Sequence, residues 1–166
     1  QVTDIFMLGA DICQLGLDQR RANILAREVG PRLGFWKPVI VSHHMLMGLE
    51  GTKAPEGYDE NKIFDAEISS KMSKSKPQSA IFVHDSKHTI EEKIGSAYCP
   101  ERIVESNPII DYCRHIIFRK FKTVKIPRPS KFGGTLECSS YNDLESSFKK
   151  GELHPLDLKN AVAGYI

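Results

Sequence analysis

The chain has 166 residues, of which 40% are hydrophobic and 27% are charged, and this balance is typical of a globular protein rather than a disordered or fibrous one. Its 23 basic and 21 acidic residues leave a formal net charge of +2, so any contact with nucleic acid must depend on local basic clusters. The four cysteines are scattered without a CxxC pair, which argues against structural zinc and favours reduced thiols in a cytoplasmic protein. No apolar run approaches the length of a membrane span.

The first part of the chain carries the pattern of an α/β domain. Apolar residues at helical spacing over 1–8 predict the last turns of a helix. A similar stripe over 18–29 predicts a second helix with Asp18 as its N-cap. Residues 11–17, between these helices, are expected to form a short connection. The β-branched run over 37–44 predicts a buried parallel strand.

A lysine-rich segment, Lys71-Met72-Ser73-Lys74-Ser75-Lys76-Pro77, follows an irregular stretch over residues 48–70. Its lysines are separated by serines and one methionine, so a flexible loop here could place several ammonium groups around one polyanion. Solvated surface loops often have the same composition, and the segment by itself leaves both interpretations open. After it, Ile81-Phe82-Val83 predicts a short strand or extended segment.

The rest of the chain is predicted to be mostly helical, with one hairpin. The expected elements are, in order, a helix over 89–98 with Thr89 or Ser86 as N-cap, a helix from Pro108, strands over 123–126 and 135–138, a helix from Ser140 to Lys149, and a last helix from His154 to the end of the chain. The boundary is expected in the polar link 85–88, which gives predicted domains of 1–84 and 85–166.

Four motifs carry a resemblance. They are the pentamer Lys71 to Ser75, which spells KMSKS, and the stretches Gln1-Val2-Thr3-Asp4-Ile5, Phe132-Gly133-Gly134 and His154-Pro155-Leu156-Asp157-Leu158-Lys159-Asn160-Ala161. The pentamer alone resembles class I aminoacyl-tRNA synthetases, and the four together resemble archaeal and eukaryotic-type tyrosyl-tRNA synthetases. The resemblance implies an α/β fold in which the C-terminal half of a Rossmann-type class I catalytic domain precedes a mostly α-helical anticodon-binding domain with a small β-hairpin.

The family activates tyrosine with ATP and transfers it to tRNA(Tyr), so the resemblance implies a tyrosine site. Asp4 matches the acceptor for the phenol hydroxyl, and a site built around that hydrogen bond rejects phenylalanine strongly. Gln1 and Gln19 match glutamines that hold the amino group and side chain of the substrate, and Leu8 would be an apolar wall. Without the resemblance, these polar residues would equally suit a solvent-facing helix surface or a first helical turn.

An ATP site is also implied. The resemblance assigns adenine contacts to the backbone of Met45, Leu46 and Met47. The lysine loop would hold the phosphates through Lys71, Met72, Ser73, Lys74 and Ser75. Because negative charge grows on the departing pyrophosphate, Lys71 and Lys74 are the expected catalytic residues, acting with Mg²⁺ that is bound to the nucleotide. Lys76 is expected to assist them.

The last three site residues belong to the implied anticodon site. Phe132 on the glycine turn would stack on a base, and Asp157, with His154 on the same helix face, would accept hydrogen bonds from a guanine edge. An acidic residue in a first helical turn also stabilises any helix, so capping is the alternative explanation for Asp157. Phosphate contacts are expected from a basic cluster that comprises Arg119, Lys120, Lys122, Lys125, Arg128 and Lys131.

The HIGH-type half of the family is not found in this sequence. Because the sequence opens without Met inside a helical pattern, we expect further sequence before Gln1, in the same molecule or in a second subunit. The complete enzyme is expected to be a homodimer, and this chain alone is expected to be inactive. The alternatives are a noncatalytic tRNA- or RNA-binding module and, less favoured, a tryptophanyl-tRNA synthetase.

The remaining histidines carry weaker predictions. His43 and His44 follow the predicted strand, where open α/β sheets bind nucleotides, and both are weak candidates for the site. His84 and His88 lie four residues apart, but no third ligand accompanies them, so a surface turn is favoured and no metal site is expected.

Overall fold

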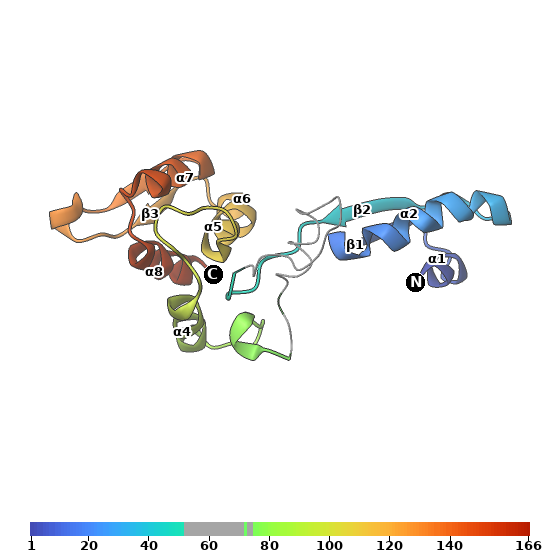
Figure 1. Ribbon diagram of the computed structural model, residues 1–166, viewed down its shortest axis with the longest axis horizontal. Helices are drawn as coiled ribbons and strands as arrows, with labels where there is room; N and C mark the ends of the chain where they lie inside the picture. Colours follow the sequence, from blue (N-terminus) through green and yellow to red (C-terminus); the bar gives the residue numbers. More distant parts are fainter. Residues whose placement is uncertain (52–71, 73–74) are drawn as a thin grey trace. The chain divides into compact units, whose positions relative to one another are not determined.

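The structure is a computed structural model that describes residues 1–51, 72 and 75–166 (Figure 1). The described residues fall into two compact units, of which unit 1 contains Gln1–Met45 and unit 2 contains 46–51, 72 and 75–166. Each unit has its own hydrophobic core. In the division into compact units, residues 75–84 belong to unit 2. The functional domains 1–84 and 85–166 stay a prediction.

Unit 1 combines two helices with a small parallel sheet. Its elements are α1 (Val2–Met7), β1 (Ile12–Gly16), a 3₁₀ turn (Leu17–Gln19), α2 (Arg20–Val29), a second 3₁₀ turn (Pro31–Leu33) and β2 (Val39–His43). Both predicted helices and the predicted strand are confirmed. The expected connection over residues 11–17 is wrong, because most of it extends and pairs with β2.

The sheet of unit 1 is less buried than the sequence predicted. β1 and β2 run parallel, with Ile12 opposite Val39 and Gly16 opposite His43. Val39 is 52% exposed and Val41 is 45% exposed, so the prediction of a buried strand is wrong for this structure. A parallel strand is buried when neighbouring strands and helices cover its edges and faces, and the described residues supply one neighbouring strand.

The helix α2 begins at Arg20, later than predicted. Asp18, the expected N-cap, lies in the 3₁₀ turn, and Gln19 directly precedes the α-helix. Asp18 instead accepts a hydrogen bond of 3.1 Å from Gln19 Nε2. α2 packs on α1 and β1, and the core between these elements consists of Ile5, Cys13 and Ala26.

Unit 2 is mostly helical and contains one two-stranded antiparallel sheet. Its elements are a 3₁₀ turn (Pro77–Ser79), α4 (Lys87–Ser96), α5 (Pro108–Tyr112), a π-helical turn (Cys113–Ile117), α6 (Phe118–Lys120), β3 (Val124–Ile126), a 3₁₀ turn (Ser130–Phe132), β4 (Leu136–Cys138), α7 (Tyr141–Lys150) and α8 (Pro155–Tyr165). The predicted hairpin and the predicted helices are confirmed. The connection between β3 and β4 extends away from the helices of this unit (Figure 1).

Two local predictions for unit 2 need correction. No strand forms at Ile81-Phe82-Val83, because the Asp85 carboxylate accepts a 2.8 Å hydrogen bond from the Phe82 amide and turns the chain at Val83. The N-cap of α4 is Ser86 rather than Thr89, since Ser86 Oγ accepts the hydrogen bond of the Thr89 amide at 3.2 Å.

The core of unit 2 is built mainly from aliphatic side chains. The helical turns from Pro108 to Lys120 are continuous, with a π-helical turn in the middle, and their apolar stripe faces α8 and the hairpin. Fully buried large side chains in this core include Ile94, Ile109, Ile110, Tyr112, Ile117, Ile126, Leu144, Phe148, Leu153 and Leu158. The helix predicted from Pro108 therefore contributes several of its apolar side chains to this core.

Candidate functional site

A pocket of about 400 Å³ in unit 2 brings together the three residues predicted to read an anticodon. It lies where the β3–β4 turn meets the start of α8. Its lining residues are Arg128, Pro129, Lys131, Phe132, Gly151, Glu152, His154, Leu156 and Asp157. Phe132, His154 and Asp157 are therefore neighbours in space although the hairpin and the helix are separate elements.

Phe132 is presented by a tight turn at the tip of the hairpin. Gly133 and Gly134 follow it with φ of 92° and 70°, a conformation that glycine adopts without strain. Arg128 holds the turn in place, because its Nε donates to the Gly134 carbonyl at 2.9 Å and its Nη1 donates to the Glu152 carbonyl at 2.6 Å. The Phe132 side chain is 60% exposed, so its ring is accessible to a stacking partner.

His154 is used to orient the start of α8. Its Nδ1 accepts a 3.1 Å hydrogen bond from the Leu156 amide and thereby caps the helix. Its Nε2 lies 3.5 Å from the carboxylate of Glu101, in the loop between α4 and α5. Both ring nitrogens thus have protein partners, and the ring itself forms a wall of the pocket.

Asp157 occupies the first turn of α8 but does not act as a capping residue. The side chain of the N-cap position is His154, and the Asp157 carboxylate makes no hydrogen bond or ion pair with the described residues. It lies at the positive end of the helix dipole, which stabilises the carboxylate anion. The pocket therefore contains an accessible acceptor beside an exposed aromatic ring.

The residues predicted to bind tyrosine lie on unit 1. Gln1, Asp4 and Leu8 are spaced so that they share one side of α1. Gln1 Nε2 donates to Asn23 Oδ1 of α2 at 3.0 Å, whereas Asp4 and Leu8 are exposed. Gln19 is bonded to its neighbour Asp18, as described above.

Asn23 was not predicted from the sequence, since an asparagine inside a helix gives no signal of its partner. Its side chain is fully buried, and among the described residues its Nδ2 has no hydrogen-bond partner. Because Asn23 Oδ1 accepts a hydrogen bond from Nε2 of Gln1, the side-chain amide of Gln1 is oriented with its oxygen directed away from Asn23.

The residues predicted to contact adenine have well-defined partners. In unit 1, Met45 packs against Gly16, where its sulfur leaves no room for a Cβ. In unit 2, the Met47 amide donates to Asp111 Oδ2 at 3.1 Å, and the Met47 carbonyl accepts from the Tyr112 hydroxyl at 3.0 Å. Burial raises the pKa of Tyr112, which keeps this donor protonated.

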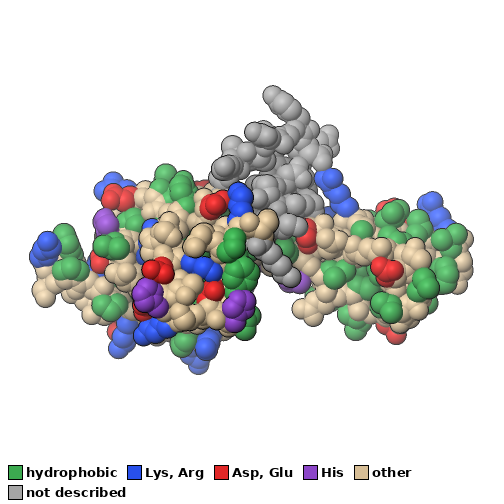
Figure 2. Space-filling view, turned by 90° about the horizontal axis from the view of Figure 1, so that it is seen from below, with side chains coloured by type: hydrophobic (Ala, Val, Ile, Leu, Met, Phe, Trp, Pro, Cys, Tyr) green, Lys and Arg blue, Asp and Glu red, His purple; other side chains and the backbone are tan. Residues whose placement is uncertain are grey.

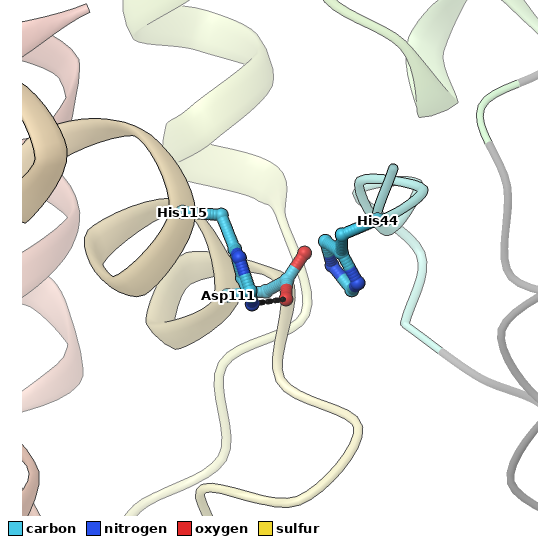
Figure 3. A group of neighbouring side chains, drawn as sticks. All are labelled: His44, Asp111 and His115. Atoms are coloured by element: carbon cyan, nitrogen blue, oxygen red, sulfur yellow. Dashed lines mark ion pairs between the residues drawn. The ribbon is translucent and has the colours of Figure 1, made fainter. Parts of the chain in front are cut away.

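Asp111 and Tyr112 are further residues that sequence patterns did not identify. Asp111 is buried on α5, and His115, one turn later, lies 3.6 Å from it (Figure 3). An acidic residue in a first helical turn is ordinary, and its link to a segment far earlier in the chain is visible only in three dimensions.

Much of the lysine loop lies outside the described residues, including Lys71, Ser73 and Lys74. Met72 packs against the core of unit 2, and Ser75 is exposed. The segments on either side of the loop are joined, because the Leu49 amide donates to the Ser79 carbonyl at 2.9 Å. Lys76 adds an ion pair of 3.4 Å with Glu50.

The remaining histidine pair does not converge on one point. His84 stacks on Phe82, with ring centroids 5.5 Å apart, and His88 lies 3.5 Å from Glu92 on α4. Among the described residues, no helix is both long enough and apolar enough to cross a membrane.

The family comparison matches the chain in two overlapping segments. Residues 1–64 and 61–166 match the family described as "tRNA synthetases class I (W and Y)". The chain is 47% identical over 178 residues to "Tyrosine--tRNA ligase" of Thermococcus sibiricus, covering 100% of this chain and 47% of that protein. It is 46% identical over 166 residues to the protein of the same name from Saccharolobus solfataricus, covering 98% and 44%. The chain thus spans about half the length of the curated relatives it matches.

Solved structures show the same similarity. The crystal structure of tyrosyl-tRNA synthetase complexed with L-tyrosine from Pyrococcus horikoshii aligns with a TM-score of 0.87 and 42% identity, covering 99% of this chain and 47% of that one. Tryptophanyl-tRNA synthetase from Giardia lamblia aligns with a TM-score of 0.58 and 22% identity, covering 93% and 32%, which supports a shared fold alone.

Proposed function

Because the chain belongs to the class I tRNA synthetases of the tryptophanyl and tyrosyl group, and within it to the archaeal tyrosyl type, we propose that it forms part of a tyrosine–tRNA ligase. The whole enzyme would join tyrosine to ATP, release pyrophosphate, and pass the tyrosyl group to tRNA(Tyr). Unit 2 would bind the anticodon. The observation that carries this proposal is the convergence of Phe132, His154 and Asp157 on one pocket.

The chemistry of this pocket suits an unpaired guanine. The exposed Phe132 ring offers a stacking surface, and stacked bases on aromatic side chains are the usual basis of single-stranded RNA recognition. The Asp157 carboxylate can accept two hydrogen bonds, which matches the adjacent N1–H and N2–H donors of a guanine Watson–Crick edge. His154 contributes by setting the direction of the first turn of α8.

The activation chemistry is assigned from the residues of the lysine loop and unit 1. Lys71 and Lys74 would neutralise the charge that develops on pyrophosphate, and Mg²⁺ bound with the nucleotide would supply further positive charge there. Asp4, Gln1, Gln19 and Leu8 would hold tyrosine. Met45, Leu46 and Met47 would contact adenine through their backbone. Both backbone groups of Met47 are bonded within unit 2, so its carbonyl, which can accept a second hydrogen bond, would make its contact.

The exposed strand β2 supports a further part of the proposal. Val39 and Val41 carry β-branched side chains that a covered parallel strand would bury. We propose that a polypeptide segment with the HIGH-type motif completes this sheet, in the same molecule or in a second subunit, and that the complete enzyme is a cytoplasmic homodimer. The four free thiols are compatible with a reducing compartment.

Asp157→Asn provides the sharpest test of base reading. An amide in place of the carboxylate turns one acceptor into a donor, so binding of an anticodon stem-loop RNA should lose its preference for guanine over inosine or adenine at the first anticodon position. The expected loss of discrimination is about 5–150-fold, which corresponds to about 1–3 kcal/mol.

Asp143→Asn is the matched control. Asp143 occupies the same position in the first turn of α7, three residues after the N-cap Ser140, and it does not line the pocket. Both substitutions remove the same favourable charge at a helix start, so their effects on stability should be similar. Unchanged discrimination in Asp157→Asn would overturn the assignment of Asp157.

A further inference from the structure

A second pocket of unit 2 has a different character from the first. Its volume is about 610 Å³, and its lining residues are Arg114, Phe118, Arg119, Phe121, Lys122, Ser139, Ser140, Tyr141 and Asn142. Three of these residues are cationic and none is acidic. Basic and acidic side chains are interspersed on the face shown in Figure 2, whereas the lining of this pocket includes no acidic residue.

The chain order places this pocket at the open end of the hairpin. Lys122 precedes β3 and Ser139 follows β4, whereas the turn with Phe132 lies at the opposite end. Five residues lie between Lys122 and Arg128, so the two positions are at most about 20 Å apart along an extended chain. Two pockets with complementary chemistry therefore lie at the two ends of one short sheet.

One cation of the pocket is held in place by aromatic packing. The Arg114 guanidinium lies 5.4 Å from the centroid of the Tyr141 ring, and Tyr141 packs edge-on against Phe118 at 6.4 Å. The nearby carboxylate of Glu145 is paired with Lys149 at 2.5 Å, and Arg114 attracts the same carboxylate electrostatically. Arg114 is thus oriented by the aromatic ring and forms no ion pair with the described residues.

The other two cations of the pocket lack an ion-pair partner in the part of the chain that the structure describes. Arg119 and Lys122 are exposed, and neither forms a hydrogen bond or ion pair with the described residues. Like charges gathered at one concave site repel each other, so this arrangement contributes nothing favourable to folding. An anion that bridges them would remove the repulsion and gain charge-assisted hydrogen bonds.

We propose that this pocket binds neighbouring backbone phosphodiesters of the RNA whose anticodon enters the first pocket, an inference that rests on the proposed function. Three cationic side chains lining one pocket of about 610 Å³ suit the successive phosphates of a strand, which carry one negative charge each. Ser139 and Asn142 add uncharged donors at the rim. Phosphate contacts of this kind position an RNA and contribute affinity without selecting its sequence.

The test uses the 166-residue chain and an anticodon stem-loop RNA at several salt concentrations. Arg119→Gln/Lys122→Gln should raise Kd on the order of tenfold and lower the slope of log K against log salt by about 1.4, since each phosphate contact of a single strand contributes about 0.7. Lys87→Gln/Lys150→Gln is the control, because it removes two exposed lysines of unit 2 outside the pocket. Its slope should stay close to that of the unaltered chain.

The same titrations separate the two proposals. The pocket variant should keep full discrimination at the first anticodon base, because it affects affinity alone, while Asp157→Asn should lose discrimination and keep the salt slope. Equal slopes for the pocket variant and the control would overturn the phosphodiester site and leave the anticodon assignment intact. Absence of RNA binding by the unaltered chain would overturn both. Binding of inorganic phosphate that the pocket variant abolishes, with an unchanged RNA slope, would identify a free-phosphate site and overturn the proposal.

Discussion

The backbone amide of Met47 donates a hydrogen bond of 3.1 Å to the buried carboxylate of Asp111. Tyr112, the next residue of α5, donates its hydroxyl to the Met47 carbonyl at 3.0 Å. Two successive side chains of one helix thus bind both polar groups of one residue. This contact fixes the segment before the lysine loop to the core of unit 2, and the Leu49–Ser79 backbone bond connects it to the segment after the loop.

Asp111→Ala should destabilise the chain by about 1–3 kcal/mol, because the Met47 amide then loses its partner in a partly buried place. Urea unfolding followed by circular dichroism measures this loss. Tyr112→Phe is the comparison, and it should cost about 0.5–1.5 kcal/mol, since it removes one neutral hydrogen bond and keeps the ring. Wild-type stability in Asp111→Ala would show that this contact does not hold the segment.

Two glycines at helix ends are expected to respond to alanine in opposite directions. Gly151 ends α7 with φ of 80°, so Gly151→Ala should destabilise the chain by about 1–2 kcal/mol. Gly95 lies in α4 with nothing within 4 Å of an added Cβ, so Gly95→Ala should stabilise by about 0.5–1 kcal/mol. Thermal unfolding of both variants checks the pair, and a shift of the same sign in both would contradict this account.

Lys93 and Asp85 form an ion pair that should make stability depend on acid pH. Lys93 is 4% exposed, and its Nζ lies 2.6 Å from the carboxylate of Asp85, 2.9 Å from the Ala80 carbonyl and 4.7 Å from the centre of the Phe82 ring. The hydrogen bond from Lys93, followed by that from the Phe82 amide, holds the pKa of Asp85 below its ordinary value. A lowered carboxyl pKa stabilises the folded state above the unfolded-state pKa of about 3.9, and this contribution disappears as pH falls through the lower folded-state pKa.

Asp85→Asn should therefore unfold at lower urea concentration than the unaltered chain at pH 7, with a difference that shrinks towards pH 2. Lys93→Met should change the pH dependence itself. It leaves the Asp85 carboxylate without its cation, so protonation of Asp85 at low pH should no longer destabilise the folded state. Urea midpoints measured from pH 2 to pH 7 compare the three proteins. A constant difference across this range would rule out the ion pair as the source of the pH dependence.

Phe132 should contribute to RNA binding through its ring and little to folding. The ring is 60% exposed, so Phe132→Ala should leave thermal stability nearly unchanged. It should weaken binding of the anticodon stem-loop by about 1–3 kcal/mol, the usual range for one stacked base. Phe132→Trp keeps an aromatic surface and should restore most of the affinity. If leucine at this position served as well as tryptophan, stacking would not be the mechanism.

Lys71→Ala tests the proposed activation chemistry in a preparation of the complete enzyme that shows ATP–pyrophosphate exchange. Removing one cation that contacts the developing pyrophosphate should lower the exchange rate on the order of a hundredfold, with little change in tyrosine affinity. Lys76→Ala should have a smaller effect, since Lys76 is paired with Glu50. Near-normal exchange in Lys71→Ala would remove this residue from the catalytic assignment.

Local signals in the sequence were sufficient for much of unit 2. Pro108 at the first helical position and Ser140 as an N-cap place two helix starts where the structure has them, and the helix predicted to end at Lys149 ends at Lys150. These signals work because each concerns bonds between residues that are close in sequence. The strand β1 was missed, since its five residues become a strand by pairing with β2, which lies beyond α2.

The sequence by itself determined the family resemblance, the hairpin, the apolar stripes and the starts of α5, α7 and α8, because these depend on neighbouring residues. Only the tertiary structure decided which of those elements meet. It brought Phe132 and Asp157 to one pocket, locked the hairpin turn by Arg128, and gave Asp111 a partner in Met47. Such contacts are set by how helices and strands pack their apolar faces. The sequence around a polar residue does not indicate which distant group this packing will place beside it.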